Sequence, residues 1–260
     1  MSTRAENLTN LFPELHQFLA KVACSPSVEF SRSPISDAGV CCGLARWIGL
    51  LVVECTQTMK ASNLTELIRY RRTVAPKNYT EENPDHDLVA ECIDMARNAP
   101  NHHRTEPCRF YLLDEKRIRE VGRLFGEQVR GSEPTPESIA RGEKKTKEWG
   151  GAPGLLVVTQ YTDRACTLVR NKPEVIKEDY ATCCCIVQNL LLLLEEQGIA
   201  TKWSTGPVWE HPEFRDVVGI PNSPPDEEVV ALLFYGMSGS PKTVRELSGL
   251  EKTLVNYRAG

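Results

Sequence analysis

The sequence lacks the motifs that mark the commonest nucleotide and metal sites. No Gly-x-Gly-x-x-Gly follows a predicted strand, and no Walker A pattern occurs. A Rossmann dinucleotide site and a P-loop are therefore both unsupported. The chain also has no His-Glu-x-x-His motif and no Cys-x-x-Cys pair. A zinc site consequently has little support, and we predict no metal.

The chain has no excess of basic charge and no long hydrophobic run. Its net charge is −4 and its pI is about 5.8, which does not favour a nucleic-acid partner, because such partners usually require a basic face. The main apolar stretch, Ala38 to Val53, contains Arg46. It is shorter than the roughly 20 residues that a membrane-spanning helix needs, so association with a membrane is not favoured.

The ten cysteines do not form the pattern of a secreted disulfide framework, which belongs to short chains with well-separated cysteines. Three of them, Cys183, Cys184 and Cys185, are consecutive within an apolar run. We predict that these three are small buried side chains in a reducing compartment. The cytoplasm is the default location, and an organelle is an alternative if residues 1–58 are a genuine extension.

Residues 1–58 differ in pattern from the rest of the 260-residue chain. Residues 59–260 begin at a second methionine, Met59, and have the length of one ordinary domain. Three interpretations of residues 1–58 stay open: a targeting extension, a weakly ordered arm, or sequence upstream of the real start. The acidic Glu6, Glu14 and Glu29 weaken the targeting interpretation, because transit peptides are poor in acidic residues.

After Met59, helical and strand patterns alternate, which predicts a layered α/β or α+β architecture. Residues 131–151 interrupt the alternation with a polar run, which we predict to be a connection that forms a lid or a surface excursion. The other expected elements are a helix starting at Ser62 or Asn63, helices over 85–98 and 180–197, a charged helix around 118–125, and strands over 109–113, 155–158, 199–203 and 229–235.

Three polar segments contain side chains that are suited to ligand binding. Arg71-Arg72-Thr73 ends the first predicted helix, and paired guanidiniums beside a hydroxyl can hold a phosphate. Asn101, His102 and Arg104 lie in a turn between two prolines, and Trp203-Ser204-Thr205 ends a predicted strand. Taken alone, the arginine pair is more typical of a solvated helix face and the second segment of a surface turn, and Trp203 is at least as typical of a core tryptophan as of a ligand site.

The order of these segments is more specific than any one of them. From about Leu64 to Pro241 they occur in the sequence Arg-Arg-Thr, Ala-Pro-Asn-His, Pro-Cys-Arg-Phe, a long Gln-Asn-Leu-Leu helix, Trp-Ser-Thr-Gly and a final Tyr-Gly. This arrangement resembles the nitroreductase family, especially its small single-domain bacterial branch. The resemblance implies an α+β fold, a three-layer α/β/α sandwich with a mixed, mainly antiparallel central sheet, and a homodimer.

The resemblance also implies a cofactor and its contacts. FMN would be bound at the dimer interface, with NADH or NADPH as electron donor. Arg71, Arg72 and Thr73 match the segment that holds the FMN phosphate and the polar edge of the ring. Asn101, His102 and Arg104 match the loop that reaches FMN from the partner subunit. Trp203, Ser204 and Thr205 match the turn beside the flavin ring, which places a backbone donor near N5.

Two departures from the family pattern concern the loop. Glu106-Pro107-Cys108 stands where the family usually has Gln-Pro-Trp, so the packing beneath the loop should differ. His103 and Arg104 replace smaller polar residues, which predicts a narrower and more basic substrate mouth. No acid–base side chain is strictly needed when the cofactor carries the reaction, and we nominate no catalytic residue.

The leading hypothesis is an FMN-dependent oxidoreductase that passes hydride from NAD(P)H to an electron-poor small molecule such as a nitroaromatic or a quinone. One alternative is a flavin-binding relative without NAD(P)H turnover, suggested by Glu106 and Cys108. Another is a membrane-associated interaction protein that uses residues 38–53, although Arg46 argues against insertion.

Overall fold

The computed structural model describes residues 64–222, 227–240 and 243–258. Contacts divide the chain into residues 1–58 and 59–260, and the described residues all belong to the second unit. The predicted cap at Ser62 or Asn63 and the apolar stretch 38–53 lie outside the described residues. The description of residues 1–58 as a separate extension therefore stays a prediction.

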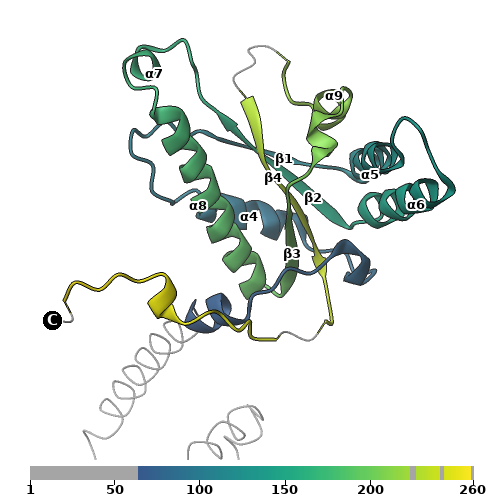
Figure 1. Cartoon of the computed structure of the whole chain (residues 1–260), viewed down its shortest axis with the longest axis horizontal. Helices are drawn as coiled ribbons and strands as arrows, with labels where there is room; N and C mark the ends of the chain where they lie inside the picture. Colours follow the sequence, from purple (N-terminus) through teal and green to yellow (C-terminus); the bar gives the residue numbers. More distant parts are fainter. Residues whose placement is uncertain (1–63, 223–226, 241–242, 259–260) are drawn as a thin grey trace, which may run out of the picture. The chain divides into compact units, whose positions relative to one another are not determined.

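A four-stranded sheet forms the centre of the fold (Figure 1). Its strands follow the order β1-β2-β4-β3, so β1 and β3 form the two edges, and all described pairs are antiparallel. A single parallel bridge joins Thr73 to Thr201 at the β3 edge. The strands are β1 (Cys108–Leu112), β2 (Gly154–Tyr161), β3 (Ile199–Ser204) and β4 (Glu227–Met237).

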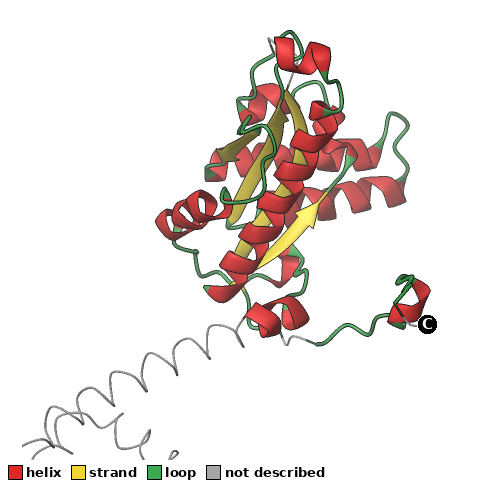
Figure 2. Ribbon diagram, turned by 90° about the vertical axis from the view of Figure 1, so that its left-hand side faces the viewer, coloured by secondary structure: helices red, strands yellow, loops and turns green. Residues whose placement is uncertain are grey.

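Helices cover both faces of the sheet. Successive side chains along β2 point to opposite faces and belong to two different apolar clusters. Leu156 and Val158 belong to the cluster that includes residues of α4 (His86–Ala96) and α8 (Val175–Glu196). Leu155 and Val157 belong to the cluster that includes residues of α5 (Glu115–Arg130), α6 (Pro136–Gly150) and α9 (Phe214–Val218). The predicted three-layer α+β sandwich is confirmed (Figure 2).

The prediction that residues 131–151 form a polar connection is wrong, because most of this segment is α6. Thr135 and Ser138 form a reciprocal capping box, and Pro136 occupies the first turn, an arrangement that favours helix initiation. A Cβ on Gly126 of α5 would lie only 2.8 Å from the carbonyl oxygen of Gly142 on α6. The two helices therefore pack closely through glycines. The sequence pattern did not predict α6 because the segment lacks the apolar stripe by which a helix is usually recognised.

The apolar α8 begins at Val175, five residues before the predicted start at 180. Among the three consecutive cysteines, Cys183 is buried, Cys184 is half-buried and Cys185 is exposed, so the prediction that all three are buried is wrong. Successive helical residues are rotated by about 100°, because a turn contains 3.6 residues. Three consecutive side chains consequently cannot all face the sheet.

Short elements complete the described structure: η1 (Pro76–Asn78), α7 (Thr167–Asn171), η2 (Pro207–Glu210) and η3 (Leu250–Lys252). Residues 64–70 are also helical and lead into Arg71. None of the helices that the structure describes has both the length and the apolar character required to cross a membrane.

Candidate functional site

The edge strand β3 brings two of the three predicted segments together. Thr73 bridges Thr201, and the backbone N–H of Val74 donates to the carbonyl of Thr201 over 2.9 Å. Trp203, Ser204 and Thr205 follow on the same strand and its exit. Since a strand rises about 3.4 Å per residue, these residues lie roughly 7–14 Å from Thr201. One elongated ligand can therefore contact both segments.

The two neighbouring arginines have different surroundings. The Arg72 guanidinium donates to the backbone carbonyls of Arg69, Arg71 and Thr243, with Nε lying 2.6 Å from the Thr243 oxygen. It therefore ties the end of the first helix to the segment that follows β4. The Arg71 side chain has no hydrogen bond or ion pair with the described residues. Of the two, Arg71 is therefore the arginine whose guanidinium no described residue engages, which suits it to bind an anion.

The turn that follows β3 offers unused hydrogen-bond donors. Within the described part of the chain, neither Thr205 nor Gly206 uses its backbone N–H in a hydrogen bond. A Cβ on Gly206 would meet no atom within 4 Å, so the backbone there is open to a ligand. On the strand itself, Thr201 Oγ1 and Trp203 Nε1 are buried without a partner. Four other buried side-chain atoms of the described residues share this state, and the Thr201 side chain is fully buried, so these two atoms do not by themselves mark a ligand site.

Lys202, whose side chain faces the opposite side of the sheet from those of Thr201 and Trp203, was missed in the sequence analysis. It is half-buried on β3, and its Nζ lies 5.7 Å from the centre of the Trp149 ring of α6. Nζ has no hydrogen bond or ion pair with the described residues. Burial lowers the pKa of Lys202, with Glu148 raising it and Lys145 lowering it further. Lys202 therefore adds positive charge to the α5/α6 side of β3, close in sequence to the turn.

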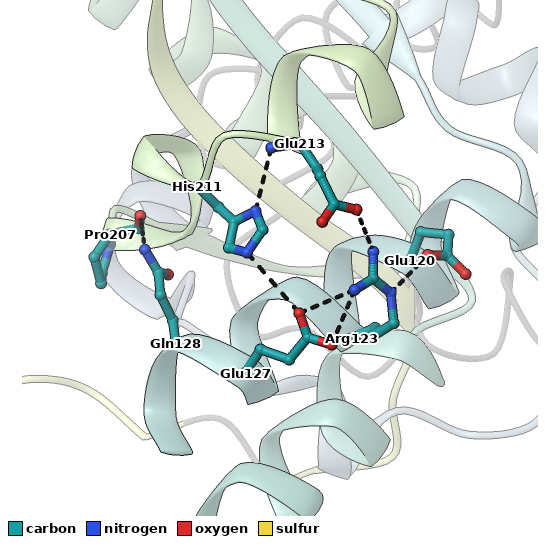
Figure 3. Close-up of polar contacts among 7 residues, drawn as sticks. All are labelled: Glu120, Arg123, Glu127, Gln128, Pro207, His211 and Glu213. Carbon is teal, nitrogen blue, oxygen red and sulfur yellow. Dashed lines mark hydrogen bonds and ion pairs between the residues drawn. The ribbon is translucent and has the colours of Figure 1, made fainter. Parts of the chain in front are cut away.

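The segment after the turn is held against α5 by a polar network (Figure 3). Gln128 donates from Nε2 to the carbonyl of Pro207 over 2.5 Å. Arg123 lies between three carboxylates and bonds Glu127 at 2.9 Å and Glu213 at 2.7 Å. The hydrogen bonds to Glu120, then Glu213 and Glu127, raise the pKa of the Arg123 guanidinium above its ordinary value. The network therefore fixes the backbone immediately beyond Gly206.

The third segment lies at the other edge of the sheet. Asn101, His102 and Arg104 belong to the loop that enters β1, and His102 and Arg104 are exposed. Three strand spacings of about 4.8 Å and four or more residues of stagger separate this loop from Thr205 by roughly 20 Å. One chain therefore does not place all the predicted residues around one small ligand.

Cys108 lies beneath the loop, at the position where the sequence analysis expects altered packing. This half-buried residue lines a surface cavity of about 700 Å³ together with Phe110, Ile186 and Arg104. Cys183 of α8 lies against it, and the hydrogen bond with Cys108, followed by burial, raises the pKa of the Cys183 thiol. Small sulfur-containing side chains consequently occupy the space beneath the loop.

The described residues contain no group of three or more His, Cys, Asp and Glu side chains that could hold a metal ion. The site at the β3 edge instead consists of guanidinium, ammonium, hydroxyl and amide donors. Such a set suits an anionic organic ligand better than a cation.

Comparisons with known proteins agree with this architecture. Residues 68–237 match the sequence model described as "Nitroreductase family". A Bacillus subtilis (strain 168) protein named "Putative NAD(P)H nitroreductase YfhC" is 27% identical over 192 residues, which cover 73% of this chain and 92% of that protein.

Solved structures show the same fold at low sequence identity. A nitroreductase-like family protein from Bacillus cereus has 24% identity and a TM-score of 0.59, covering 75% of this chain and 96% of the other. A nitroreductase with bound FMN from Bacteroides fragilis has 19% identity and a TM-score of 0.56, covering 74% and 97%. Iodotyrosine deiodinase bound to FMN and 3-iodo-L-tyrosine has 22% identity and a TM-score of 0.53, covering 76% and 100%.

Proposed function

Because the chain belongs to the nitroreductase family, we propose that it is an FMN-dependent oxidoreductase that passes hydride from NADH or NADPH to an electron-poor small molecule. A nitroaromatic or a quinone fits this description. The observation that carries the proposal is a set of donors at the β3 edge that have no partner among the described residues: the Arg71 guanidinium and the backbone N–H groups of Thr205 and Gly206. Names of relatives that include FMN and NAD(P)H support the same cofactors here.

The residues present fit FMN in size, charge and order. Arg71 and Thr73 would hold the phosphate at one end, where the first helix ends beside Thr201. The backbone N–H groups of Thr205 and Gly206 would donate to the ring nitrogens at the other end. The backbone of Thr201 joins the two ends through its bridge to Thr73, while its side chain is fully buried. In this arrangement Arg72 supports the site indirectly, by holding the helix end and the segment at Thr243.

When bound, FMN supplies two-electron chemistry, accepting hydride from a nicotinamide and returning it to an acceptor. The protein residues bind, orient and supply charge. Lys202 would place positive charge beside the ring, which stabilises negative charge that develops there during reduction. Its half-buried position strengthens this effect, since a charge pair is less screened away from water.

The loop of Asn101, His102 and Arg104 would complete the site from a second copy of the chain. In one copy it is too far from Thr205 to share the ligand, whereas the fold places it at an open sheet edge. We therefore propose a homodimer in which each copy offers this loop to the site of the other. Exposed His102 and Arg104 would make the mouth of the site basic.

The proposal is tested by adding FMN to the purified full chain and separating it by size-exclusion chromatography with light scattering and visible absorbance. We expect flavin to elute with protein of twice the chain mass. A colourless dimer would leave the assembly in place but remove the cofactor. A yellow monomer would show that the loop contributes nothing to flavin binding.

A further inference from the structure

Asp179 is a buried carboxylate that the sheet edge and the proposed flavin contacts do not use. It lies in the first half of α8 and is only 3% exposed. Among the residues that the structure describes, it has no ion-pair partner. Burial of a carboxyl group is costly unless hydrogen bonds compensate it, so its partners indicate its role.

Two threonine hydroxyls satisfy this carboxylate. Thr105 donates from Oγ1 to Oδ1 of Asp179 over 2.5 Å, and Thr162 donates from Oγ1 to Oδ2 over 2.7 Å. Thr162 is itself held by Gln160, whose Nε2 donates to its hydroxyl over 2.9 Å. Oδ2 of Asp179 thus accepts from Thr162, which follows β2, and Oδ1 accepts from Thr105 in the loop that precedes β1.

Thr105 occupies the most constrained part of that loop. Its neighbours Arg104 and Glu106 have φ angles of 53° and 46°. Residues with a side chain rarely adopt this left-handed region, which is energetically unfavourable for them. The backbone N–H of Thr105 also donates to Oδ1 of Asn101 over 3.2 Å. A conformation of this kind persists only where surrounding contacts enforce it.

Other contacts join the same loop to α8. Thr182, one helical turn after Asp179, donates to the carbonyl of Pro100 over 3.1 Å. His103 lies 3.5 Å from the carboxylate of Glu178. Neither of these two contacts involves residues 104–106. Asp179 is therefore the group on α8 that acts directly at the left-handed pair.

We propose that Asp179 is a positioning residue that fixes the loop so that Asn101, His102 and Arg104 are presented to the flavin site of a second copy. Asp179 acts through Thr105 and does not touch the ligand. This inference rests on the proposed function for its consequence, but the effect on loop conformation can be measured without flavin.

The test compares Thr105→Val, which removes the hydroxyl at nearly constant volume, with Thr105→Ser, which keeps it. Thr162→Val is the matched control, because it removes the other hydrogen bond to Asp179 and leaves the loop intact. For each full-length variant, FMN affinity is measured by fluorescence titration. Trypsin cleavage after Arg104 is followed by mass spectrometry, and folding is checked by thermal melting.

We expect Thr105→Val to weaken FMN binding about tenfold and to accelerate cleavage after Arg104, because it removes the hydroxyl that bonds Asp179 over 2.5 Å and also lies 3.2 Å from Oδ1 of Asn101. Thr105→Ser should match the wild type in both measurements, and Thr162→Val should match it despite a lower melting temperature. The inference would be overturned if Thr105→Val and Thr162→Val changed FMN affinity and cleavage equally. It would also be overturned if Thr105→Ser lost FMN affinity or was cleaved faster than the wild type. If the valine variant does not fold, Thr105→Ala serves in its place.

The outcomes separate this inference from the proposed function. If the wild type binds no FMN, the function fails, while the cleavage after Arg104 still decides whether Thr105 holds the loop. If the wild type binds FMN and neither measurement responds to Thr105→Val, the positioning role fails and the function stands.

Discussion

Arg71 and Arg72 are adjacent, yet their environments predict opposite consequences of removing each side chain. Arg71 has no hydrogen-bond partner among the described residues, so Arg71→Ala should leave stability unchanged. If its guanidinium holds the FMN phosphate, loss of one charged hydrogen bond should weaken binding by about 1.5–3 kcal/mol, or roughly 10- to 150-fold.

Arg72→Ala should instead affect the fold. Its guanidinium bonds three backbone carbonyls, of Arg69, Arg71 and Thr243. Because these groups are partly exposed, we expect a loss of about 1–3 kcal/mol in total. In a domain of this size, that corresponds to a decrease of about 2–12 °C in melting temperature. FMN affinity should fall less than in the Arg71 variant.

The assay pairs flavin fluorescence titration with thermal melting of the flavin-free protein, applied to both variants and to the wild type. The two variants serve as controls for each other, since they remove the same charge from neighbouring positions. The reasoning is refuted if Arg71→Ala binds FMN normally while Arg72→Ala loses affinity without losing stability. That result would make Arg72 the ligand-binding arginine.

Three further predictions concern charge, packing and the cysteine run. Lys202→Met should lower the two-electron midpoint potential of bound FMN by roughly 20–60 mV, equivalent to about 1–3 kcal/mol. Lys144→Met, at an exposed position on α6, should not lower it, and equal shifts of the two variants in a spectroelectrochemical titration would remove Lys202 from the site. Gly126→Ala should destabilise the fold by about 1–3 kcal/mol in urea unfolding, because the new Cβ would lie 1.9 Å from Thr146 Oγ1; an unchanged midpoint would show that the helix pair adapts freely. Cys184→Ser should retain full activity under reducing conditions, and a specific loss of turnover with an intact fold would contradict a purely structural role for this half-buried thiol.

The layered fold could be predicted because its core elements carry strong local patterns. The apolar run Leu155–Val158 identifies β2 as a buried strand, and the Leu190–Leu194 run identifies α8 as a buried helix. The polar α6 could not be found in the same way. Its position depends on glycines that bring it close to α5 and on Trp149, which stacks on Phe125 with ring centres 3.8 Å apart. Such contacts form between elements and leave little pattern in either one.

The candidate site was predictable by segment but less so by residue. The sequence analysis selected Arg71-Arg72-Thr73 and Trp203-Ser204-Thr205, and the bridge at Thr201 joins them. It gave no means of distinguishing Arg71 from Arg72, because that difference depends on the fold around Thr243.

The residues that were missed are also explained by tertiary contacts. Lys202 is an ordinary strand residue in the sequence, and its significance comes from the burial beside Trp149. Asp179 depends on hydroxyls of Thr105 and Thr162, which are 74 and 17 residues away along the chain. Local periodicity contains no information about pairs of that kind.

The central claim is most directly tested by recording the visible spectrum of the FMN-loaded protein under anaerobic conditions, before and after NADH or NADPH is added. The account predicts that the bound-flavin absorbance bleaches with a nicotinamide and returns when a nitroaromatic or a quinone is supplied. Bound flavin that keeps its colour with both nicotinamides would contradict the account, and would identify a flavin-binding protein without NAD(P)H turnover.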